Sequence, residues 1–429
     1  SGAMADAWMP EFYGDHMVFQ RDKQIRIAGR THGRQNVRVT LGSHSADTQA
    51  DEHGNWSVTL PPLKAQAGLT LVIRTNNENV YKDVAVGDLW LLAGPGREAT
   101  DENLARRDGA GPAVEDCPDI RFQQDRTWMP ATAESFSRIP VAAYSFAREV
   151  SRQTKSPVGV LMRVGWNATQ AWIPADACKA EPQLRQEYDR LAKAHLAKVR
   201  QWIDQLEGDL DNLTPRQLRP PQPSFVMDVG AAFDASARPL ANIPVRGVIW
   251  CQGSNNAPDG MFHTVRMKVL VDAWRLAWTD PSLPFYSVQA MRCDRPDLPE
   301  FWRAQLASAT QIPHCEIAHC DDLARPGKAA ARTELGKRLA RIALVRTYGL
   351  KGLEWAGPRF KSAAVQAGGI RVEFDHASSG LAVNDDKPLS GFEIAGDDGV
   401  FVPADARIEG GAVIVSSEKV AAPKFVRYG

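Results

Sequence analysis

The stretch Val86-Gly-Asp-Leu-Trp-Leu-Leu-Ala-Gly-Pro-Gly-Arg-Glu98 decides the fold, because an apolar run gives way there to a glycine- and proline-rich turn. Leu89 to Ala93 are apolar without helical spacing, which is typical of a buried strand. Gly94, Pro95 and Gly96 then mark a turn. The sequence therefore predicts a strand that carries a loop to one end of a sheet, and this loop is the expected functional site.

Before this stretch, the chain alternates apolar and polar residues in short runs, at residues 24–28, 37–41, 56–60 and 69–74. Turn residues separate several of these runs, as in Glu52-His-Gly-Asn55. Alternation of this kind is typical of half-buried strands in an antiparallel sandwich. We expect an N-terminal β-sandwich accessory domain over residues 5–85.

After this stretch, apolar strands alternate with helical patterns. The expected helices cover residues 136–154, 184–206, 265–278 and 333–348, and the expected strands cover residues 157–162, 245–250 and 285–289. Such alternation predicts a parallel sheet covered by helices on both faces, with ligands collected by the loops at the carboxyl ends of its strands. We expect this α/β domain over residues 86–350. Strand-like alternation returns from Phe360, which predicts a C-terminal β domain over residues 351–429.

Composition excludes several classes of function. The 429 residues are 44% apolar and 24% charged, with 51 basic and 51 acidic side chains, so no net positive charge favours nucleic acid. No apolar run approaches the roughly 20 residues of a membrane span. Ser1-Gly-Ala-Met4 resembles a vector-derived remnant, and any export signal is expected to have been removed. Six cysteines are too few for a disulfide scaffold in a chain of this size, and the oligomeric state stays open.

Several longer motifs resemble one known family. They are Asp15-His-Met-Val-Phe-Gln-Arg21, Asp51-Glu-His-Gly-Asn-Trp56 and Tyr81-Lys-Asp-Val-Ala-Val-Gly-Asp-Leu-Trp-Leu-Leu-Ala-Gly94. In these stretches the chain resembles the sialate O-acetylesterase family of SGNH-type hydrolases. The resemblance implies an SGNH-hydrolase-like (flavodoxin-like) parallel sheet, a carbohydrate substrate and a periplasmic or secreted location.

The resemblance breaks down at the residues that carry the family's chemistry. The family's strand ends in Gly-Gln-Ser-Asn-Met, where the serine attacks an acetyl ester; here the five positions read Gly94-Pro-Gly-Arg-Glu98, so Gly96 occupies the position of the nucleophile. The family's Asp-Ile-His-Pro motif corresponds to Asp321-Asp-Leu-Ala-Arg-Pro326, which has no histidine beside the proline. Because a serine esterase needs its nucleophile and base together, we do not expect ordinary O-acetylesterase chemistry.

Two further landmarks are partly retained. Met162 to Trp172 stands where the family has Ser-Trp-Gly-Gly-Thr followed by Glu-Ala-Trp; Ala171-Trp172 is kept and the glycine pair is altered. Ile249 to Ala257 matches Ile-Trp-Tyr-Gln-Gly-Glu-Ser-Asn-Ala, with Gln252, Gly253 and Asn256 retained. The resemblance places Asn256 at the family's oxyanion asparagine.

A rebuilt site of this kind favours a glycoside hydrolase that uses carboxylates and water. That reaction needs a protonated acid on one side of the scissile bond and a base on the other. The candidates for these roles are Glu98, Glu102, Asp321, Asp322 and His263.

The candidates for substrate binding come from the same loops. A bidentate grip by Arg97 and Arg163 favours an acidic sugar, such as a sialic or uronic acid. Trp166 is a candidate for stacking on a sugar ring, with Gly96, Gln252 and Asn256 lining the site. No cofactor is expected.

Each of these residues also has an ordinary structural interpretation. Charged residues after a turn are often solvated or begin a helix, aspartates such as Asp321 and Asp322 often cap one, and His263 is suited to a helix core. The pairs His314-Cys315 and His319-Cys320 fit a zinc site, a Cys315–Cys320 disulfide or two plain thiols. Two other functions stay open: a glycan-binding protein that has lost the reaction, and an O-acetylesterase with an unrecognised nucleophile.

Overall fold

The computed structural model describes residues 7–96, 116–165, 168–208, 229–323, 329–383 and 387–428. The chain divides into two compact units, residues 1–349 and 350–429. The larger unit has a mixed α/β fold built on one large sheet, and the smaller unit is made of strands.

Strand β7 (Glu78–Gly94) organises the larger unit because it takes part in two groups of strands. Its first half pairs with antiparallel β6 (Gln66–Arg74) and with parallel β1 (Val18–Gln20). Its second half lies between two parallel strands, β10 (Val158–Val164) and β11 (Gly247–Cys251). The stretch that decides the fold is therefore the centre of the α/β sheet.

The α/β part of the sheet has the strand order β13-β12-β11-β7-β10-β8-β9. All neighbours are parallel except β8 and β9, which form an antiparallel hairpin. The remaining bounds are β8 (Cys117–Gln124), β9 (Thr127–Ala131), β12 (Phe285–Val288) and β13 (Cys315–Ala318). Without the hairpin, β7 is the first strand in sequence and the second in space, which is the order of flavodoxin-like sheets.

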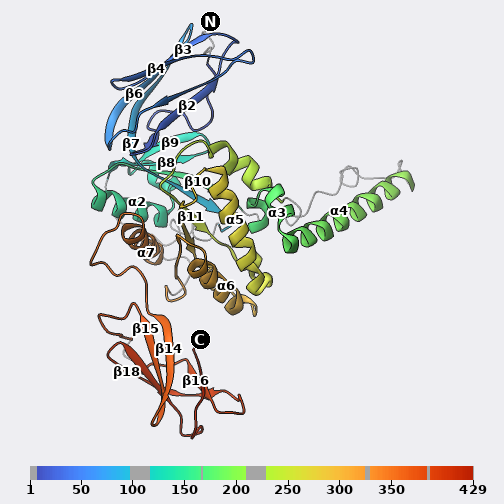
Figure 1. The fold of residues 1–429 in the computed structure, drawn as a ribbon, viewed down its shortest axis with the longest axis vertical. Helices are drawn as coiled ribbons and strands as arrows, with labels where there is room; N and C mark the ends of the chain where they lie inside the picture. The colour runs from blue at the N-terminus through green and yellow to red at the C-terminus, as the bar shows by residue number, and fades with distance from the viewer. Residues whose placement is uncertain are drawn as a thin grey trace. The chain divides into compact units, whose positions relative to one another are not determined.

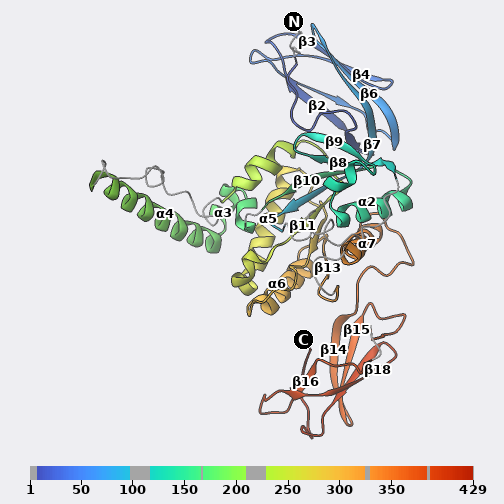
Figure 2. The same ribbon diagram turned by 180° about the vertical axis from the view of Figure 1, so that it is seen from behind.

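Helices cover both sides of these strands (Figure 1, Figure 2). On one side α2 packs against α7, and on the other α5 packs against α6. The bounds are α2 (Val141–Thr154), α3 (Ala175–Ala180), α4 (Pro182–Gly208), α5 (His263–Ala277), α6 (Leu298–Gln311) and α7 (Ala329–Arg346), with shorter helices η1 (Ser135–Arg138), η2 (Thr169–Trp172), η4 (Phe233–Ala237), η5 (Arg238–Leu240) and η6 (Ser254–Phe262).

Burial on two sides explains the continuous apolar run in β7. The Trp90 ring packs on Phe146 of α2 at 5.1 Å between ring centroids. Leu91 belongs to the core on the opposite side, which also contains Trp172, Trp250 and Trp274. Trp172 and Trp250 are at most 1% exposed, so these two tryptophans are core residues rather than sugar-binding surfaces.

The N-terminal strands form a largely antiparallel sheet and a two-stranded companion. In the sheet β4 pairs with β3, β3 with β6 and β6 with β7; the companion pairs β2 with β5. The bounds are β2 (Ile25–Arg30), β3 (Asn36–Leu41), β4 (His44–Gln49) and β5 (Asn55–Leu60). Inward residues such as Ile27, Val39 and Ile73 are fully buried, in keeping with the alternation of the sequence.

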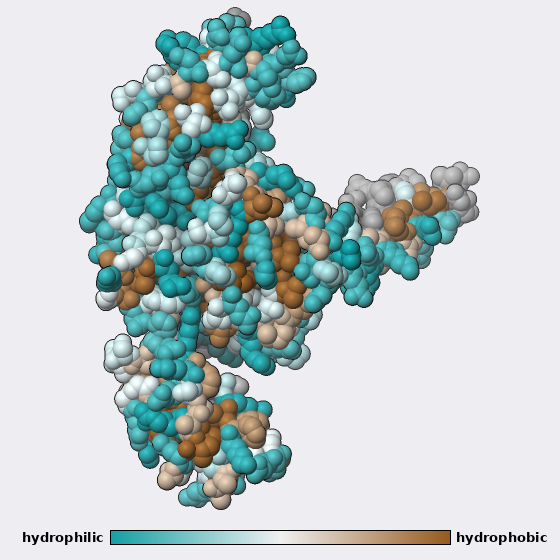
Figure 3. Space-filling view, in the orientation of Figure 1, coloured by the Kyte–Doolittle hydropathy of each residue, from teal (hydrophilic) through white to brown (hydrophobic). Residues whose placement is uncertain are grey.

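Helix α4 carries apolar side chains on its surface. Leu196 and Ile203 are 61% and 40% exposed, and apolar atoms are visible along this helix in the space-filling view (Figure 3). Among the described residues, no helix is long and apolar enough to cross a membrane.

The C-terminal unit has two small sheets, ordered β14-β15-β19-β18 and β17-β16-β20. Its core contains Ile370, Val372, Phe392, Ile394, Val413 and Val415. The bounds are β14 (Arg359–Gln366), β15 (Gly369–Asp375), β16 (Phe392–Ala395), β17 (Val402–Pro403), β18 (Asp405–Glu409), β19 (Ala412–Ser416) and β20 (Phe425–Tyr428).

The structure contains elements that the sequence patterns did not reveal, namely the β8–β9 hairpin, α6 and β13. The domain boundary expected after residue 85 falls inside β7, because this single strand runs through both groups of strands. The N-terminal β-sandwich as a separate domain therefore stays a prediction.

Candidate functional site

The candidate site lies at the carboxyl ends of β7 and β11. After β7, the chain forms β8, β9 and β10 on one side of β7, and β11 lies on the other side. Ligands of open α/β sheets bind in the crevice at such a topological switch point. The residues that follow the two strands are Pro95 and Gly96 after β7, and Gln252 and Gly253 after β11.

Gly96 is packed closely against the end of β11. Its backbone N–H donates a hydrogen bond to the carbonyl oxygen of Cys251 at 2.8 Å. A Cβ atom added to Gly96 would lie 2.8 Å from the carbonyl carbon of Gln252 and 2.9 Å from the oxygen of Cys251. These are backbone atoms, so a side chain at the nucleophile position needs the loop or the strand to move.

Asn256 is buried and makes four hydrogen bonds. Its Oδ1 accepts from the backbone N–H and from the hydroxyl of Thr169, both at 2.8 Å. Its Nδ2 donates to Oε1 of Gln170 at 3.2 Å and to Oδ2 of Asp259 at 2.7 Å. Because both Nδ2 hydrogens are engaged, an oxyanion would have to displace one of these partners.

Gln252 belongs to the same buried network. Its Oε1 accepts from the indole N–H of Trp250 at 2.9 Å and from the Thr169 hydroxyl at 3.2 Å, and its Nε2 donates to the Gly253 carbonyl at 3.0 Å. The structure therefore brings Gly96, Gln252 and Asn256 to one end of the sheet, but Gln252 and Asn256 support the local fold and are at most 5% exposed.

Arg163 lies near the end of β10, and its guanidinium is bound by other side chains. Its Nη2 donates to Oε1 of Gln123 at 2.7 Å and to Oε1 of Glu11 at 3.3 Å. The side chain is 9% exposed, and its burial lowers its pKa. Arg163 thus ties β10 to β8 and to the N-terminal segment, which leaves its guanidinium unsuited to gripping a substrate carboxylate.

His263 lies in the core, at the start of α5. It is 1% exposed, and its ring packs on Phe301 at 4.6 Å between centroids. Burial, with a further contribution from the positive charge of Arg266, lowers the pKa of His263 to about 3. A group that is neutral at ordinary pH and closed off from solvent does not suit general acid or base catalysis, so we assign His263 to the core.

Asp321 and Asp322 follow β13 and each binds an arginine. Asp321 accepts two hydrogen bonds from Arg292, both at 2.7 Å, and Asp322 accepts two from Arg338, both at 2.7 Å. The Arg338 guanidinium holds the pKa of Asp322 below its usual value. Asp322 is thereby kept ionised, which is the opposite of what a general acid of a glycosidase needs.

The other predicted site residues are Arg97, Glu98, Glu102 and Trp166, and they lie outside the described residues. Their proposed roles stay predictions.

Two hydroxyl or thiol groups near the site, those of Thr169 and Cys251, are unsuitable as nucleophiles. Thr169 is fully buried, and burial raises the pKa of the Cys251 thiol to about 12. Cys315 and Cys320 are separate, buried thiols rather than a disulfide. Within the described ranges, no group of three or more His, Cys, Asp or Glu residues is arranged to hold a metal ion.

Two residues near this edge were missed in the sequence. Arg292 follows β12 by four residues, and its guanidinium lies 5.4 Å from the ring centroid of Trp302 in α6. The position of Arg292 just after a parallel strand is a signal that places it at the ligand-binding edge. For Trp302 the sequence holds no comparable signal, because its proximity results from the packing of α6.

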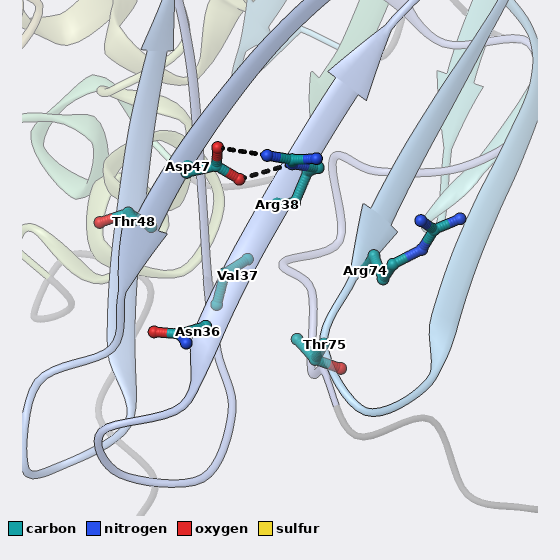
Figure 4. Close-up of a pocket in the computed structure, with 7 residues that line it drawn as sticks. All are labelled: Asn36, Val37, Arg38, Asp47, Thr48, Arg74 and Thr75. Atoms are coloured by element: carbon teal, nitrogen blue, oxygen red, sulfur yellow. Dashed lines mark hydrogen bonds and ion pairs between the residues drawn. The ribbon is translucent and has the colours of Figure 1, made fainter.

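A separate surface hollow lies on the N-terminal sheet and is lined by Asn36, Val37, Arg38, Asp47, Thr48, Arg74 and Thr75 (Figure 4). Arg38 donates two hydrogen bonds to Asp47, both at 2.7 Å. Arg74 pairs with Glu78. Arg38 and Asp47 are therefore paired within the hollow, while Arg74 is paired with a residue outside its lining. The hollow is formed by residues of β3, β4 and β6 and by Thr75, away from the switch point.

Comparisons with known proteins find two acetylesterases that are similar to the chain. No family model matches the chain. The chain is 23% identical to the sialate O-acetylesterase of Rattus norvegicus over 360 residues, which cover 71% of the chain. The match covers 65% of the rat protein, slightly less than two thirds of the length of that protein. It superposes on a carbohydrate acetylesterase from Xanthomonas citri with a TM-score of 0.77 and 25% identity, covering 98% of the chain and 94% of that protein. Sequence and fold together show that the chain resembles the sialate O-acetylesterases and related carbohydrate acetylesterases.

Proposed function

We propose that this protein binds carbohydrate at the carboxyl ends of β7 and β11 without the acyl-serine chemistry of the esterases it resembles. The observation that carries the proposal is the packing of Gly96, whose added Cβ would lie 2.8 Å from the Gln252 backbone. A serine at this position would have neither the room nor, at Asp321 to Pro326, a histidine base. The fold and its ligand-binding edge are retained, and binding can outlast catalysis on the same scaffold.

The occupied Asn256 amide supports the same conclusion. Oxyanion stabilisation needs donors aimed at the developing charge and free to bind it. Both Nδ2 hydrogens of Asn256 are bound to Gln170 and Asp259. The group that matches the family's oxyanion donor therefore stabilises the fold in this chain.

Glycoside hydrolysis, the reaction favoured by the sequence, has less support from the described residues. Of its five candidate acids and bases, His263 is buried, while Asp321 and Asp322 are bound by arginines. Only Glu98 and Glu102, outside the described residues, still carry that hypothesis. A periplasmic or secreted location, inferred from the resemblance, belongs to this proposal as well.

The test combines binding with turnover in the full-length protein. Binding to a panel of neutral and acidic oligosaccharides is measured by calorimetry, and hydrolysis is followed with acetyl esters, O-acetylated sialosides, and aryl sialosides and glucuronides. We expect saturable binding of at least one glycan and no hydrolysis of any substrate above the uncatalysed rate.

A steric variant locates the binding edge. Gly165 follows β10, and no described atom lies within 4 Å of a Cβ added there. Gly165→Trp should therefore fold normally and block a glycan at this edge, whereas Gly357→Trp, at an equally open position in the C-terminal unit, should leave binding intact. Ester hydrolysis through a covalent acyl intermediate, or turnover of a glycoside that is lost in Glu98→Gln, would contradict the proposal.

A further inference from the structure

The two ends of helix α4 differ in their surroundings. Near the beginning, the ammonium nitrogen of Lys179 in α3 lies 5.1 Å from the ring centroid of Tyr188. Glu187, in the same part of α4, binds Arg266 of α5 at 2.6 Å. The remainder of the helix projects away from the sheet and from the helices that cover it (Figure 1, Figure 2). We name residues 192–206 the α4 arm.

Four apolar side chains lie on one face of the α4 arm. Leu196, Val199, Ile203 and Leu206 follow one another at spacings of three, four and three residues, which places them in one stripe along the helix. Leu196 is 61% exposed and Ile203 is 40% exposed, and the other two are half-buried. Apolar atoms are visible on this helix in the space-filling view (Figure 3). An alternation of three and four residues is the spacing with which two helices pack along a shared seam.

One acidic and one basic side chain stand beside this stripe. Arg200 and Asp204 are exposed, lie four residues apart, and have no ion-pair partner among the described residues. In a symmetric antiparallel pair of helices, the same flank of each helix faces its counterpart. Arg200 of each helix then lies opposite Asp204 of the other, so the flank is complementary in charge to itself.

We propose that the α4 arm docks on the α4 arm of a second copy of this chain, with the two helices antiparallel. A two-fold axis beside residue 201 places Val199 opposite Ile203 of the second copy. The same axis places Leu196 opposite Leu206 of the second copy. Burial of the exposed apolar surface drives the association, and a contact of this self-complementary kind is the usual form of a homodimer interface.

An anionic lipid surface fits the α4 arm less well than a second copy does. Helices that lie on membranes carry mainly basic side chains on their polar face. Beside the apolar stripe, the basic residues Lys193 and Arg200 are accompanied by the acidic residues Asp189 and Asp204, and all four are exposed. This flank therefore has no net charge to attract anionic lipid, whereas a second copy uses both signs.

The first experiment measures the association of the full-length protein by sedimentation velocity at increasing protein concentration. Because the paired segment is short, its interface is smaller than that of a stable dimer, and we expect a weak dimer that forms as the concentration rises. The double variant Leu196→Glu/Ile203→Glu should stay monomeric at every concentration. The matched control Ala194→Glu/Gln201→Glu places the same two charges at exposed positions on the opposite face of the helix and should associate as the wild type does.

The second experiment tests the antiparallel arrangement by charge reversal. Arg200→Asp and Asp204→Arg should each weaken self-association by about threefold or more, because each replaces two exposed ion pairs by like charges. An equimolar mixture of the two variants restores opposite charges at both contacts. The mixture should therefore form a heterodimer at least as tightly as the wild type forms its homodimer.

The outcomes decide between the possible occupants of the α4 arm. A wild-type protein that is monomeric at all concentrations overturns the proposal, as does a dimer that persists in Leu196→Glu/Ile203→Glu. A monomer that cosediments with phosphatidylserine-containing vesicles, and no longer does so in that variant, overturns it in favour of a lipid surface. A dimer that is lost in that variant and recovered in the charge-reversed mixture supports it. None of these measurements depends on carbohydrate binding, so this inference and the proposed function are tested separately.

Discussion

Gly96 shows that the loss of a nucleophile extends beyond one side chain. Its backbone bonds to Cys251, and the space that a side chain would occupy is taken by the backbone of Cys251 and Gln252. At Gly94, two residues before Gly96, φ is 122°, and an added Cβ would lie 2.5 Å from the backbone oxygen of Cys251. The backbone of Cys251 and Gln252 therefore leaves no room for a side chain at the position that matches the esterase nucleophile.

We predict that Gly96→Ser destabilises the protein by about 1–3 kcal/mol, as overpacking does, and does not produce ester hydrolysis. Denaturant unfolding and an acetyl ester assay measure the two effects. Gly165→Ser is the control, because its added Cβ meets no described atom within 4 Å, and its stability should stay within about 0.5 kcal/mol of the wild type. A stable, hydrolytically active Gly96→Ser protein would show that the loop is free to move.

His263 makes the stability of the protein depend on pH. Its pKa is lowered to about 3 by burial and by Arg266, whereas an unfolded histidine has a pKa near 6.5. Between these values the unfolded chain binds a proton that the folded protein does not. This contribution to stability is therefore complete above about pH 6.5 and decreases as the pH falls toward 3.

We predict that His263→Phe flattens this dependence. In the wild type the free energy of unfolding should fall by up to about 1.4 kcal/mol per pH unit below pH 6.5 on account of this histidine. A phenylalanine does not titrate and can pack on Phe301, which the histidine ring now contacts. Urea unfolding at pH 4.5, 5.5 and 7 measures the slope, and identical slopes for the two proteins would contradict the assignment.

At the scale of elements, a buried ion-pair network joins α4, η6 and α5 next to the site. Arg266 of α5 is 2% exposed and binds Asp259 of η6 at 2.8 Å and Glu187 of α4 at 2.6 Å. Asp259 also accepts the hydrogen bond from Asn256. The arginine therefore holds the segment after β11 through its carboxylate partners, and Asn256 depends on this arrangement.

We predict that Arg266→Met costs about 3–5 kcal/mol of stability, because it leaves two carboxylates without their buried partner. The matched control is Lys268→Met in the same helix. Lys268 pairs with Asp272 on the surface, where the side chains are 68% and 52% exposed, and such pairs contribute at most about 1 kcal/mol. Thermal and urea unfolding of both variants provide the test, and equal losses would show that the Arg266 network contributes no more than a surface pair.

At the scale of the whole molecule, the chain contains two compact units with separate cores. The larger unit is built around β7 and the smaller around Val372, Ile394 and Val415. Units with their own cores are able to unfold independently. The N-terminal strands, by contrast, share β7 with the α/β sheet.

We predict two transitions in the calorimetric unfolding of the full chain. Ile394→Ala in the smaller unit and Leu270→Ala in the larger unit each truncate a fully buried side chain, which typically costs about 2–5 kcal/mol. Each variant should lower a different transition. If both variants shift one common transition, the two units unfold together.

The sequence by itself determined the α/β character of the middle of the chain and the central place of residues 86–96. This information is local, because the spacing of apolar residues and the glycine-proline turn can each be recognised within a short stretch of sequence. The motifs around Asp15, Gly87 and Ile249 also carried the resemblance to the sialate O-acetylesterases. The absence of a serine at position 96 was visible there too.

Only the tertiary structure decided which polar side chains are accessible. Arg163 and His263 resemble site residues in the sequence, yet Arg163 is bound by Glu11 and His263 packs on Phe301. Arg292 received no role in the sequence, yet it is exposed beside Trp302. The residues that contact these side chains come from segments far apart in the sequence. No local sequence pattern encodes these contacts, because they depend on how the helices and strands pack.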